Sequence, residues 1–124
     1  MKSEVKMESP AKEKSKAFAI RIVNLYKFLV ETYKDYTIAK QVLRSGTSIG
    51  ANLAEAECAI SRNDFASKVY IALKECSETE YWLELLHRKE KINDELFRQI
   101  NNMRGTIQRK LIASIITAKK NQDR

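Results

Sequence analysis

The sequence is poor in residues that interrupt helices and in residues that bind metals. Its 124 residues include three Gly and one Pro, which argues against a turn-rich β-sandwich or a collagen-like chain. One His and two Cys, Cys58 and Cys76, cannot complete a Cys/His zinc set, and their spacing is not that of a CxxC motif. We therefore expect two small buried thiols and neither a metal nor another cofactor.

The sequence also lacks a long apolar run. The longest candidate, residues 17–30, contains Arg21, Asn24 and Lys27, and so is too polar for a transmembrane helix. The start of the chain is polar and shows no apolar segment of the signal-peptide kind. These absences predict a cytoplasmic protein without a membrane partner.

Positive charge is in excess. The chain is 44% hydrophobic and 31% charged with a net charge of +7, and residues 91–124 carry +5 of that excess. A basic segment of this kind attracts phosphate backbones or acidic partners. Many small domains are basic without such a partner, so both interpretations stay open.

Four stretches show the 3.6-residue periodicity of amphipathic helices. They predict helices over residues 9–35, 37–60, 63–89 and from 93 towards the C-terminus, with N-caps at Ser9, at Ser61 or Asn63, and at Asn93. The predicted core positions are Phe18, Ile22, Leu25 and Leu29, then Ile38, Val42, Ile49, Leu53, Ala56 and Ile60, then Phe65, Val69, Ala72, Cys76 and Leu83, and finally Leu96, Ile100, Met103, Ile107, Leu111, Ser114 and Ala118.

The connections between these helices are short, so sequential neighbours should run antiparallel. The prediction is an all-α protein, an antiparallel up-down-up-down four-helix bundle. Residues 1–8 are expected to form a flexible tail, and residues 9–124 a single domain.

The second and third predicted helices have features that a single bundle does not explain. Residues 45–54 contain no charge, and Gly46, Gly50 and Ala54 recur every four residues. Large apolar side chains of the third helix lie off its core stripe, which is typical of a protein interface. We expect a contact between copies of the chain formed by Ser45, Gly46, Ser48, Gly50, Asn52, Glu55, Ile71, Trp82 and Leu85. Close packing of the first two helices within one subunit is the alternative explanation for the glycines.

Carboxylates beside these stripes raise the question of catalysis. In an antiparallel pair, Glu55 should lie near Lys68, and Arg44 should be able to pair with Glu78, which favours a structural hydrogen-bond network. A Glu-x-x-His motif ends at His87 but occurs once, whereas a di-metal bundle needs two. Phosphate-binding loops and the context of a Ser-His-Asp triad are absent. The sequence therefore predicts a protein that is not an enzyme.

The fourth predicted helix carries a basic stripe suited to phosphate contacts. Its members are Lys91, Arg98, Arg109, Lys119 and Lys120. Aromatic residues are not interleaved with it, so base stacking is not indicated. An ordinary solvated helix face is the alternative.

Residues 44–86 resemble a four-helix-bundle family that includes the 23S rRNA intervening-sequence proteins. The resembling segments are R-S-G-T-S-I-G-A-N-L-A-E-A (44–56), S-x-x-D-F (61–65) and I-A-L-K-E-C-S-E-T-E-Y-W-L-E-L-L (71–86). The chain departs from the family pattern in having Ala56 where many members have Gly, and Lys74 and Glu75 where many have Gly-Ser. The outer helices match only in pattern and length.

This resemblance implies a bundle that assembles into a ring-shaped homo-oligomer, typically a homopentamer, with no established enzymatic activity. Ser48, Asn52, Glu55 and Glu78 would act in it as determinants of the fold or the interface. Related accessory proteins of diversity-generating retroelements are basic rings that bind a reverse transcriptase and nucleic acid. The resemblance thus suggests a non-enzymatic adaptor or scaffold whose partners are itself and RNA, DNA or a nucleic-acid enzyme. The alternative is a structural protein–protein interaction module without a nucleic-acid ligand.

Overall fold

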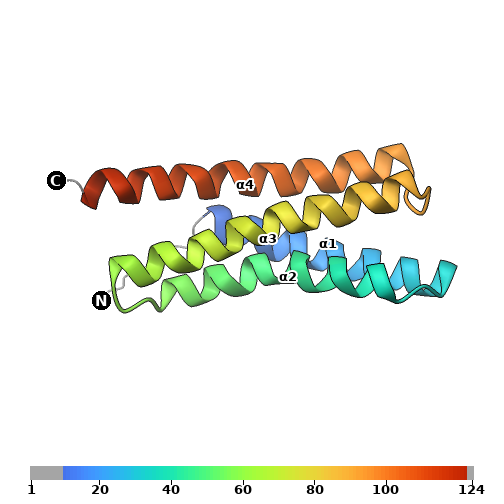
Figure 1. The fold of residues 1–124 in the computed structure, drawn as a ribbon, viewed down its shortest axis with the longest axis horizontal. Coiled ribbons are helices and arrows are strands. Elements are labelled where there is room, and N and C mark those ends of the chain that lie inside the picture. Colours follow the sequence, from blue (N-terminus) through green and yellow to red (C-terminus); the bar gives the residue numbers. More distant parts are fainter. Residues whose placement is uncertain (1–9, 123–124) are drawn as a thin grey trace.

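The computed structural model describes residues 10–122 as four helices, with no strand among them (Figure 1). They are α1 (Pro10–Tyr33), α2 (Thr37–Glu57), α3 (Arg62–Arg88) and α4 (Asp94–Gln122). Successive helices run antiparallel, and α1 also contacts α4, which closes the bundle. The all-α four-helix prediction is confirmed. The expected tail and the Ser9 cap lie outside the described residues.

The core is formed by the apolar stripes of the four helices. The largest fully buried side chains include Phe18 and Ile22 of α1, Ile49 of α2, Leu83 of α3 and Ile107 of α4. Burying each such side chain stabilises the fold by about 1.5–3 kcal/mol. The hydrophobic pattern therefore accounts for which face of each helix points inward.

The helix ends show why the chain turns where it does. The Ser61 hydroxyl accepts a hydrogen bond from the Asp64 amide, and the Asn93 side chain accepts one from the Leu96 amide. Both side chains satisfy amides that the first helical turn leaves without a partner. The expected cap at Asn93 is confirmed, and Ser61, not Asn63, caps α3.

Three residues near the α2–α3 connection differ from the prediction. Helix α2 ends at Glu57, so Ile60 is not part of it and is 93% exposed, whereas the sequence placed Ile60 in the core. Cys58 is exposed, while Cys76 is buried as expected. Phe65, also placed in the core, is 38% exposed. For Cys58 and Ile60 the Ser61 cap is the physical reason, because the chain must leave α2 early enough to turn into α3. Phe65 lies in the first turn of α3, at the end of the bundle.

The four helix–helix contacts are not equally tight. Gly46 and Gly50 of α2 face Ile22 and Ser15 of α1 at close range. Helices α1 and α4 make the fewest contacts of the four adjacent pairs, and Arg21 of α1 bridges them by donating to Gln99. The bundle is therefore closed firmly along α1–α2 and loosely along α1–α4.

Candidate interaction surfaces

A half-buried surface runs along the outer side of the α2–α3 contact. Six of the nine residues predicted to contact a second copy reach it, and together they define what we call the α2–α3 surface: Ser48, Asn52, Glu55, Ile71, Trp82 and Leu85. Glu55 is exposed and the other five are half-buried. The structure therefore brings the polar residues of α2 and the off-core apolar residues of α3 together on one side of the bundle.

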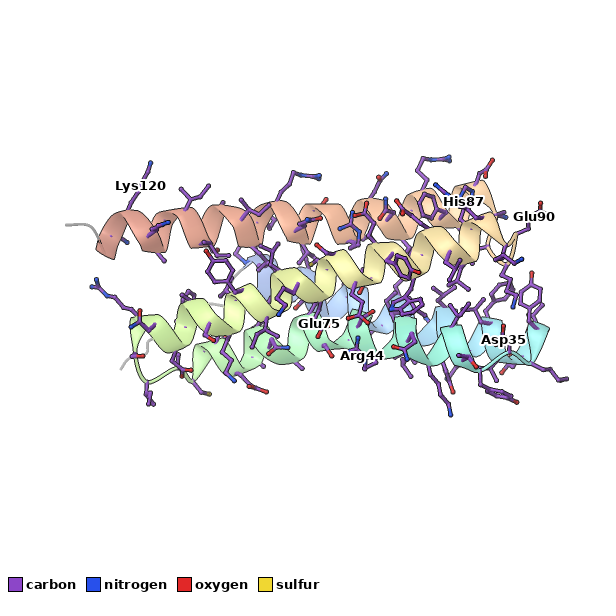
Figure 2. The ribbon with its side chains drawn as sticks, in the orientation of Figure 1. Asp35, Arg44, Glu75, His87, Glu90 and Lys120 are labelled. Carbon is purple, nitrogen blue, oxygen red and sulfur yellow. The ribbon has the colours of Figure 1, made fainter. Side chains whose placement is uncertain are left out.

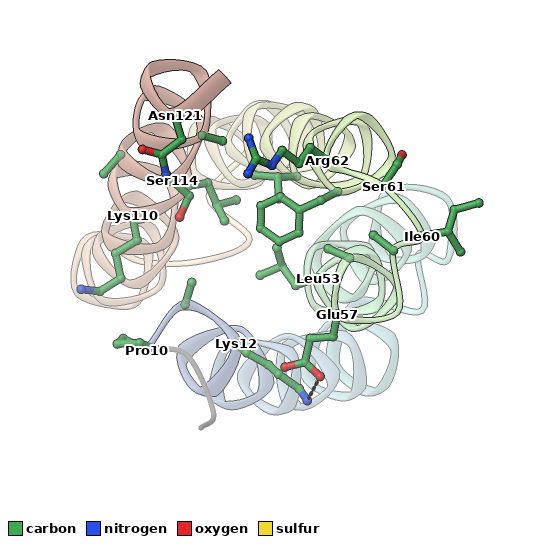
Figure 3. A pocket seen from close by; sticks show the side chains of 18 residues that line it. Pro10, Lys12, Leu53, Glu57, Ile60, Ser61, Arg62, Lys110, Ser114 and Asn121 are labelled. Carbon is green, nitrogen blue, oxygen red and sulfur yellow. Dashed lines mark hydrogen bonds and ion pairs between the residues drawn. The ribbon is translucent and has the colours of Figure 1, made fainter. Parts of the chain in front are cut away.

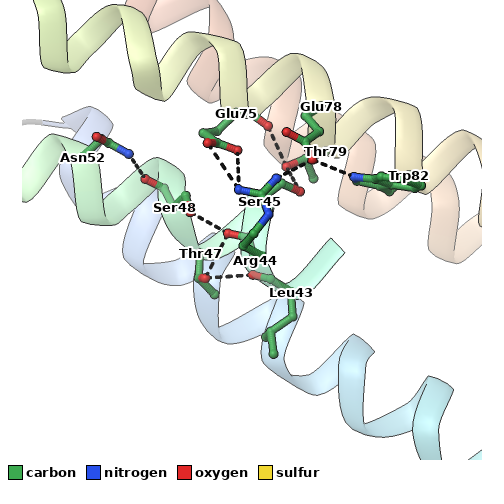
Figure 4. A network of polar contacts seen from close by, with 10 residues as sticks. All are labelled: Leu43, Arg44, Ser45, Thr47, Ser48, Asn52, Glu75, Glu78, Thr79 and Trp82. Carbon is green, nitrogen blue, oxygen red and sulfur yellow. Dashed lines mark hydrogen bonds and ion pairs between the residues drawn. The ribbon is translucent and has the colours of Figure 1, made fainter. Parts of the chain in front are cut away.

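Ion pairs cross this surface from one helix to the other. Arg44 donates to Glu78 and to Glu75, with 3.4 Å between its Nη1 and Glu75 Oε1, and Lys68 Nζ lies 2.8 Å from Glu55 Oε1 (Figure 4). The pairs of Arg44 with Glu78 and of Lys68 with Glu55 were expected from an antiparallel helix pair, whereas the pair of Arg44 with Glu75 was not. These ion pairs fix the register of α2 against α3.

One oxygen of the Glu78 carboxylate, Oε2, takes part in this network. It accepts hydrogen bonds from Arg44 and from Trp82 Nε1, the latter at 3.1 Å, and these bonds lower the pKa of Glu78. The bond to Glu78 raises the pKa of Arg44 in turn. A general acid at neutral pH needs a raised carboxyl pKa, so this geometry favours a structural role.

Three of the nine predicted contact residues are already packed inside the subunit. Ser45 is fully buried, its hydroxyl 2.9 Å from that of Thr79. Gly46 is buried against Ile22, and Gly50 packs against Ser15. The close contact of the first two helices thus explains the glycines. Ser45 and Gly46, being buried, do not reach a second copy.

Ser48 and Asn52 bond to their own helix but stay accessible. The Ser48 hydroxyl donates to the Arg44 carbonyl at 2.6 Å, and the Asn52 amide nitrogen donates to the Ser48 carbonyl at 2.9 Å. The amide oxygen of Asn52 accepts no hydrogen bond from the residues that the structure describes. A second chain packed on this surface would find that acceptor available.

The predicted basic stripe divides into two parts. Lys91 lies in the α3–α4 connection, with its Nζ 2.5 Å from Asp35 Oδ2 and 5.5 Å from the centre of the Tyr33 ring. The hydrogen bond from Lys91 lowers the pKa of Asp35. Glu90 and Lys120 lie at opposite ends of the molecule, which separates Lys91 from the end of α4 (Figure 2).

The other members of the stripe are exposed on α4. Arg98, Lys119 and Lys120 have no ion-pair partner among residues 10–122, and Arg109 donates to Thr106 Oγ1 at 3.1 Å. Within the described part of the chain, no carboxylate competes with an anionic ligand for these four cations. Lys91 is held by Asp35 and is not brought together with them.

Charge is distributed unevenly between the two sides of the bundle. Helices α1 and α4 together contain eleven Lys or Arg and four acidic residues. Helices α2 and α3 together contain six Lys or Arg and seven acidic residues. Lys14 of α1 is exposed and Lys110 of α4 half-buried, and neither has an ion-pair partner within the described part of the chain. Sequence reasoning missed these two because it considered the charge of each segment separately.

A buried arginine in α4 was also missed. Arg104 is 5% exposed, donates from Nε to Asn101 Oδ1 at 2.7 Å and also to Gln108, and pairs with Glu80 of α3 at 3.2 Å. Polar residues three before and four after an arginine on one helix are the signal that sequence reasoning overlooked. Its engagement on all sides indicates a role in joining α3 to α4.

An apolar groove of about 890 Å³ opens at the end of the bundle where α1 begins and α4 ends (Figure 3). Its lining includes Leu53 of α2, Phe65 and Val69 of α3, and Leu111 of α4. Lys12, Arg62 and Lys110 also line it, and Lys12 Nζ pairs with Glu57 at 2.8 Å.

Groups that could hold a metal ion and helices that could span a membrane are both absent from the described residues. No group of three or more His, Cys, Asp or Glu side chains between residues 10 and 122 is arranged to hold a metal ion. Within the same range, no helix is both long and apolar enough to span a bilayer.

His87 shares a 2.6 Å hydrogen bond with Asp94 Oδ1 and stacks on Phe97.

The model of a family described as 23S rRNA-intervening sequence protein matches residues 7–113. The chain belongs to this family. None of the curated proteins is significantly similar to the chain. A crystal structure at 1.70 Å of a protein of unknown function from the S23 ribosomal protein family, from Bacteroides thetaiotaomicron VPI-5482, is similar to it with a TM-score of 0.84. The two chains are 59% identical over 85% of this chain and 97% of that one. Neither comparison indicates an enzymatic family.

Proposed function

We propose that this intervening-sequence family member is a non-enzymatic adaptor that assembles into a ring-shaped homopentamer and presents a basic outer surface to RNA or another nucleic acid. One observation carries the proposal: the two sides of the bundle differ in chemistry. The α2–α3 side combines half-buried apolar side chains with a nearly balanced charge, whereas the α1–α4 side holds the charge excess.

The α2–α3 surface suits a contact between copies. Ile71, Trp82 and Leu85 are half-buried in one subunit and would lose their remaining exposed area against a neighbour. Aromatic anchors of this kind dominate the binding energy of many interfaces. Closure into a ring requires this surface to meet a different surface of the next copy.

The basic side suits phosphates and offers little means of reading bases. Arg98, Arg109, Lys119 and Lys120 present fork and point charges, and an amide beside them is supplied by Asn102. Binding of this kind is weak in sequence specificity and strongly dependent on salt. A ring would repeat the cations around its outside and turn a weak attraction into a multivalent one.

The engaged carboxylates support a function without catalysis. Glu78 is held by Arg44 and Trp82, and Glu55 by Lys68, so these acids serve the helix contact. The adaptor then acts by holding partners near one another.

A salt titration tests the nucleic-acid part of the proposal. The wild type should bind structured RNA and duplex DNA at low micromolar protein in 50 mM salt, and the affinity should fall at least about tenfold by 200 mM because phosphate contacts release counterions. The variant Arg98→Glu, Arg109→Glu, Lys120→Glu should lose this binding. A matched variant of exposed cations on the other helices and the α3–α4 connection, Lys40→Glu, Arg88→Glu, Lys89→Glu, makes the same change in net charge and should retain most of it.

Two results would contradict this part of the proposal. If the wild type binds neither nucleic acid in 50 mM salt, the basic side is a solvated face and the protein is a protein–protein scaffold. If both triple variants lose binding equally, net charge and not the α4 surface is responsible.

A further inference from the structure

The groove at the open end of the bundle combines an aromatic ring with cations that come from different helices. Phe65 and Arg62 belong to the first turn of α3, while Lys110 belongs to α4. Figure 3 shows Arg62 and Lys110 on separate helices around the same opening. Phe65 and Lys110 are 45 residues apart, so sequence patterns do not indicate that they line the same groove.

Among the described residues that line the groove, cations outnumber carboxylates. Glu57, which lines it, is paired with Lys12, and Asp64, two residues after Arg62, accepts one hydrogen bond from the Ile60 amide. Arg62 and Lys110 have no ion-pair partner among the described residues. Among the described residues, the groove therefore offers an apolar interior and two cations without an ion-pair partner, which together suit a ligand with an apolar ring and a negative backbone.

The groove lies beside the basic surface of α4. Lys110 lines the groove, whereas Arg109 lies about 100° from it around the helix. A strand bound to Arg109 would reach the groove by crossing the face of α4. The volume of the groove, about 890 Å³, falls in the range of about 300–1,000 Å³ typical of small-ligand sites and is sufficient for a nucleobase.

We propose that the groove takes an unpaired base of single-stranded RNA, which stacks on Phe65 while the adjoining phosphates contact Arg62 and Lys110. The proposal rests on the nucleic-acid part of the proposed function and adds the strand state of the ligand. Aromatic platforms in positively charged grooves are the usual means of binding single strands. A base in an intact duplex reaches such a site only after unstacking, which costs energy.

The test compares one RNA strand alone and paired. The probe is a fluorescein-labelled RNA of twelve nucleotides without self-complementarity, used single-stranded and as a duplex with its complement, in 50 mM salt, with binding followed by anisotropy. The wild type should bind the single strand more tightly. Phe65→Leu keeps an apolar side chain and should weaken single-strand binding by about tenfold, the order expected for one stacked base, while duplex binding stays unchanged.

Two further variants separate stacking from a general loss of structure. Phe65→Trp keeps an aromatic face, so it should bind like the wild type and its fluorescence should be quenched by the RNA. Tyr70→Leu removes an exposed aromatic ring of the same helix outside the groove and should have no effect. Circular dichroism should show equal helicity for all three variants, since neither side chain is buried.

Equal binding of both RNA forms, unchanged in Phe65→Leu, would overturn the groove proposal and leave the proposed function intact. A loss of binding that comes with a smaller particle mass would overturn it by identifying the groove as a contact between copies. If Phe65→Leu weakens binding in the full chain but not in a chain without residues 2–9, that segment is the occupant and the proposal fails. If neither RNA binds, the nucleic-acid part of the proposed function fails as well, and an acidic protein segment becomes the occupant that the charge of the groove favours.

Discussion

Gly46 of α2 lies so close to Ile22 of α1 that a Cβ added to the glycine would be 2.9 Å from Ile22 Cγ1. Ile22 is fully buried and branched at Cβ, so it has little freedom to move aside. The glycine costs helix propensity of about 1 kcal/mol relative to alanine, and the close approach of two helices offsets that cost.

Gly46→Ala should therefore destabilise the protein although alanine is the better helix former. We expect a loss of about 1–3 kcal/mol in the free energy of unfolding, because an extra methyl group overpacks the α1–α2 contact. Gly105→Ala is the matched control, since a Cβ there would meet only Arg109 Nη1 at 3.4 Å, and it should stabilise by about 0.5–1 kcal/mol. Urea unfolding measures both. A gain in stability in both variants would contradict the packing described.

The two thiols should differ sharply in reactivity. Cys58 is exposed at the end of α2, whereas Cys76 is buried in α3 and its burial raises the pKa of the thiol to about 12. A thiol reagent such as DTNB at pH 8 should modify one thiol per folded chain, and none in Cys58→Ser. Unfolding in urea should make the second thiol available. Two reactive thiols in the folded wild type would show that Cys76 is accessible.

The same burial predicts how stability changes in alkaline solution. The unfolded thiol ionises near its ordinary value of 9.0, while the folded thiol stays protonated up to about 12. Ionisation thus favours the unfolded state in this interval, and the contribution of Cys76 is complete below pH 9 and lost as the pH rises. Between pH 9 and about 12, the free energy of unfolding of the wild type should fall relative to that of Cys76→Ala by about 1.4 kcal/mol per pH unit. A difference that does not vary with pH would contradict the raised pKa.

Arg104 should matter more than an exposed arginine of the same helix. Arg104→Met leaves Asn101, Gln108 and Glu80 without their common donor, and should cost about 1–3 kcal/mol of stability. Arg109→Met removes an exposed side chain and should change stability by no more than about 0.5 kcal/mol. Thermal unfolding of both variants decides the matter. Equal effects would mean that the buried guanidinium contributes no more than a surface one.

Local rules predicted most of the fold. The caps at Ser61 and Asn93 and the apolar periodicity were sufficient to place the helices, because each depends on residues within one or two turns. The pairing of Arg44 with Glu78 also followed from an antiparallel geometry counted outward from the α2–α3 turn. Ile60 was misplaced because periodicity continues past the residue where a helix ends.

What the sequence could not show depends on contacts between distant residues. Arg104 falls beside the core stripe of α4, and its burial is only understandable once Glu80 of α3 is placed against it. Phe65 of α3 and Lys110 of α4 both line the groove, which depends on how the two helices are placed in space. The glycines at 46 and 50 fitted two explanations until Ile22 and Ser15 were found opposite them.

A pair of charge substitutions should locate the contact between copies. Ile71→Lys places a cation on the α2–α3 surface and should dissociate the assembly into folded monomers, because a charge in an apolar contact is not compensated. Ile20→Lys changes an even more exposed isoleucine, on α1, and should leave the assembly intact. Retention of the assembly in Ile71→Lys would place the contact elsewhere.

Light scattering of the wild-type protein at tens of micromolar, coupled to size-exclusion chromatography, tests the central claim most directly. The chain has a mass of 14.3 kDa, and a homopentameric ring should have about five times that mass. A dimer would preserve a contact between copies but contradict the ring. A particle of 14.3 kDa at this concentration would contradict self-assembly through the α2–α3 surface altogether.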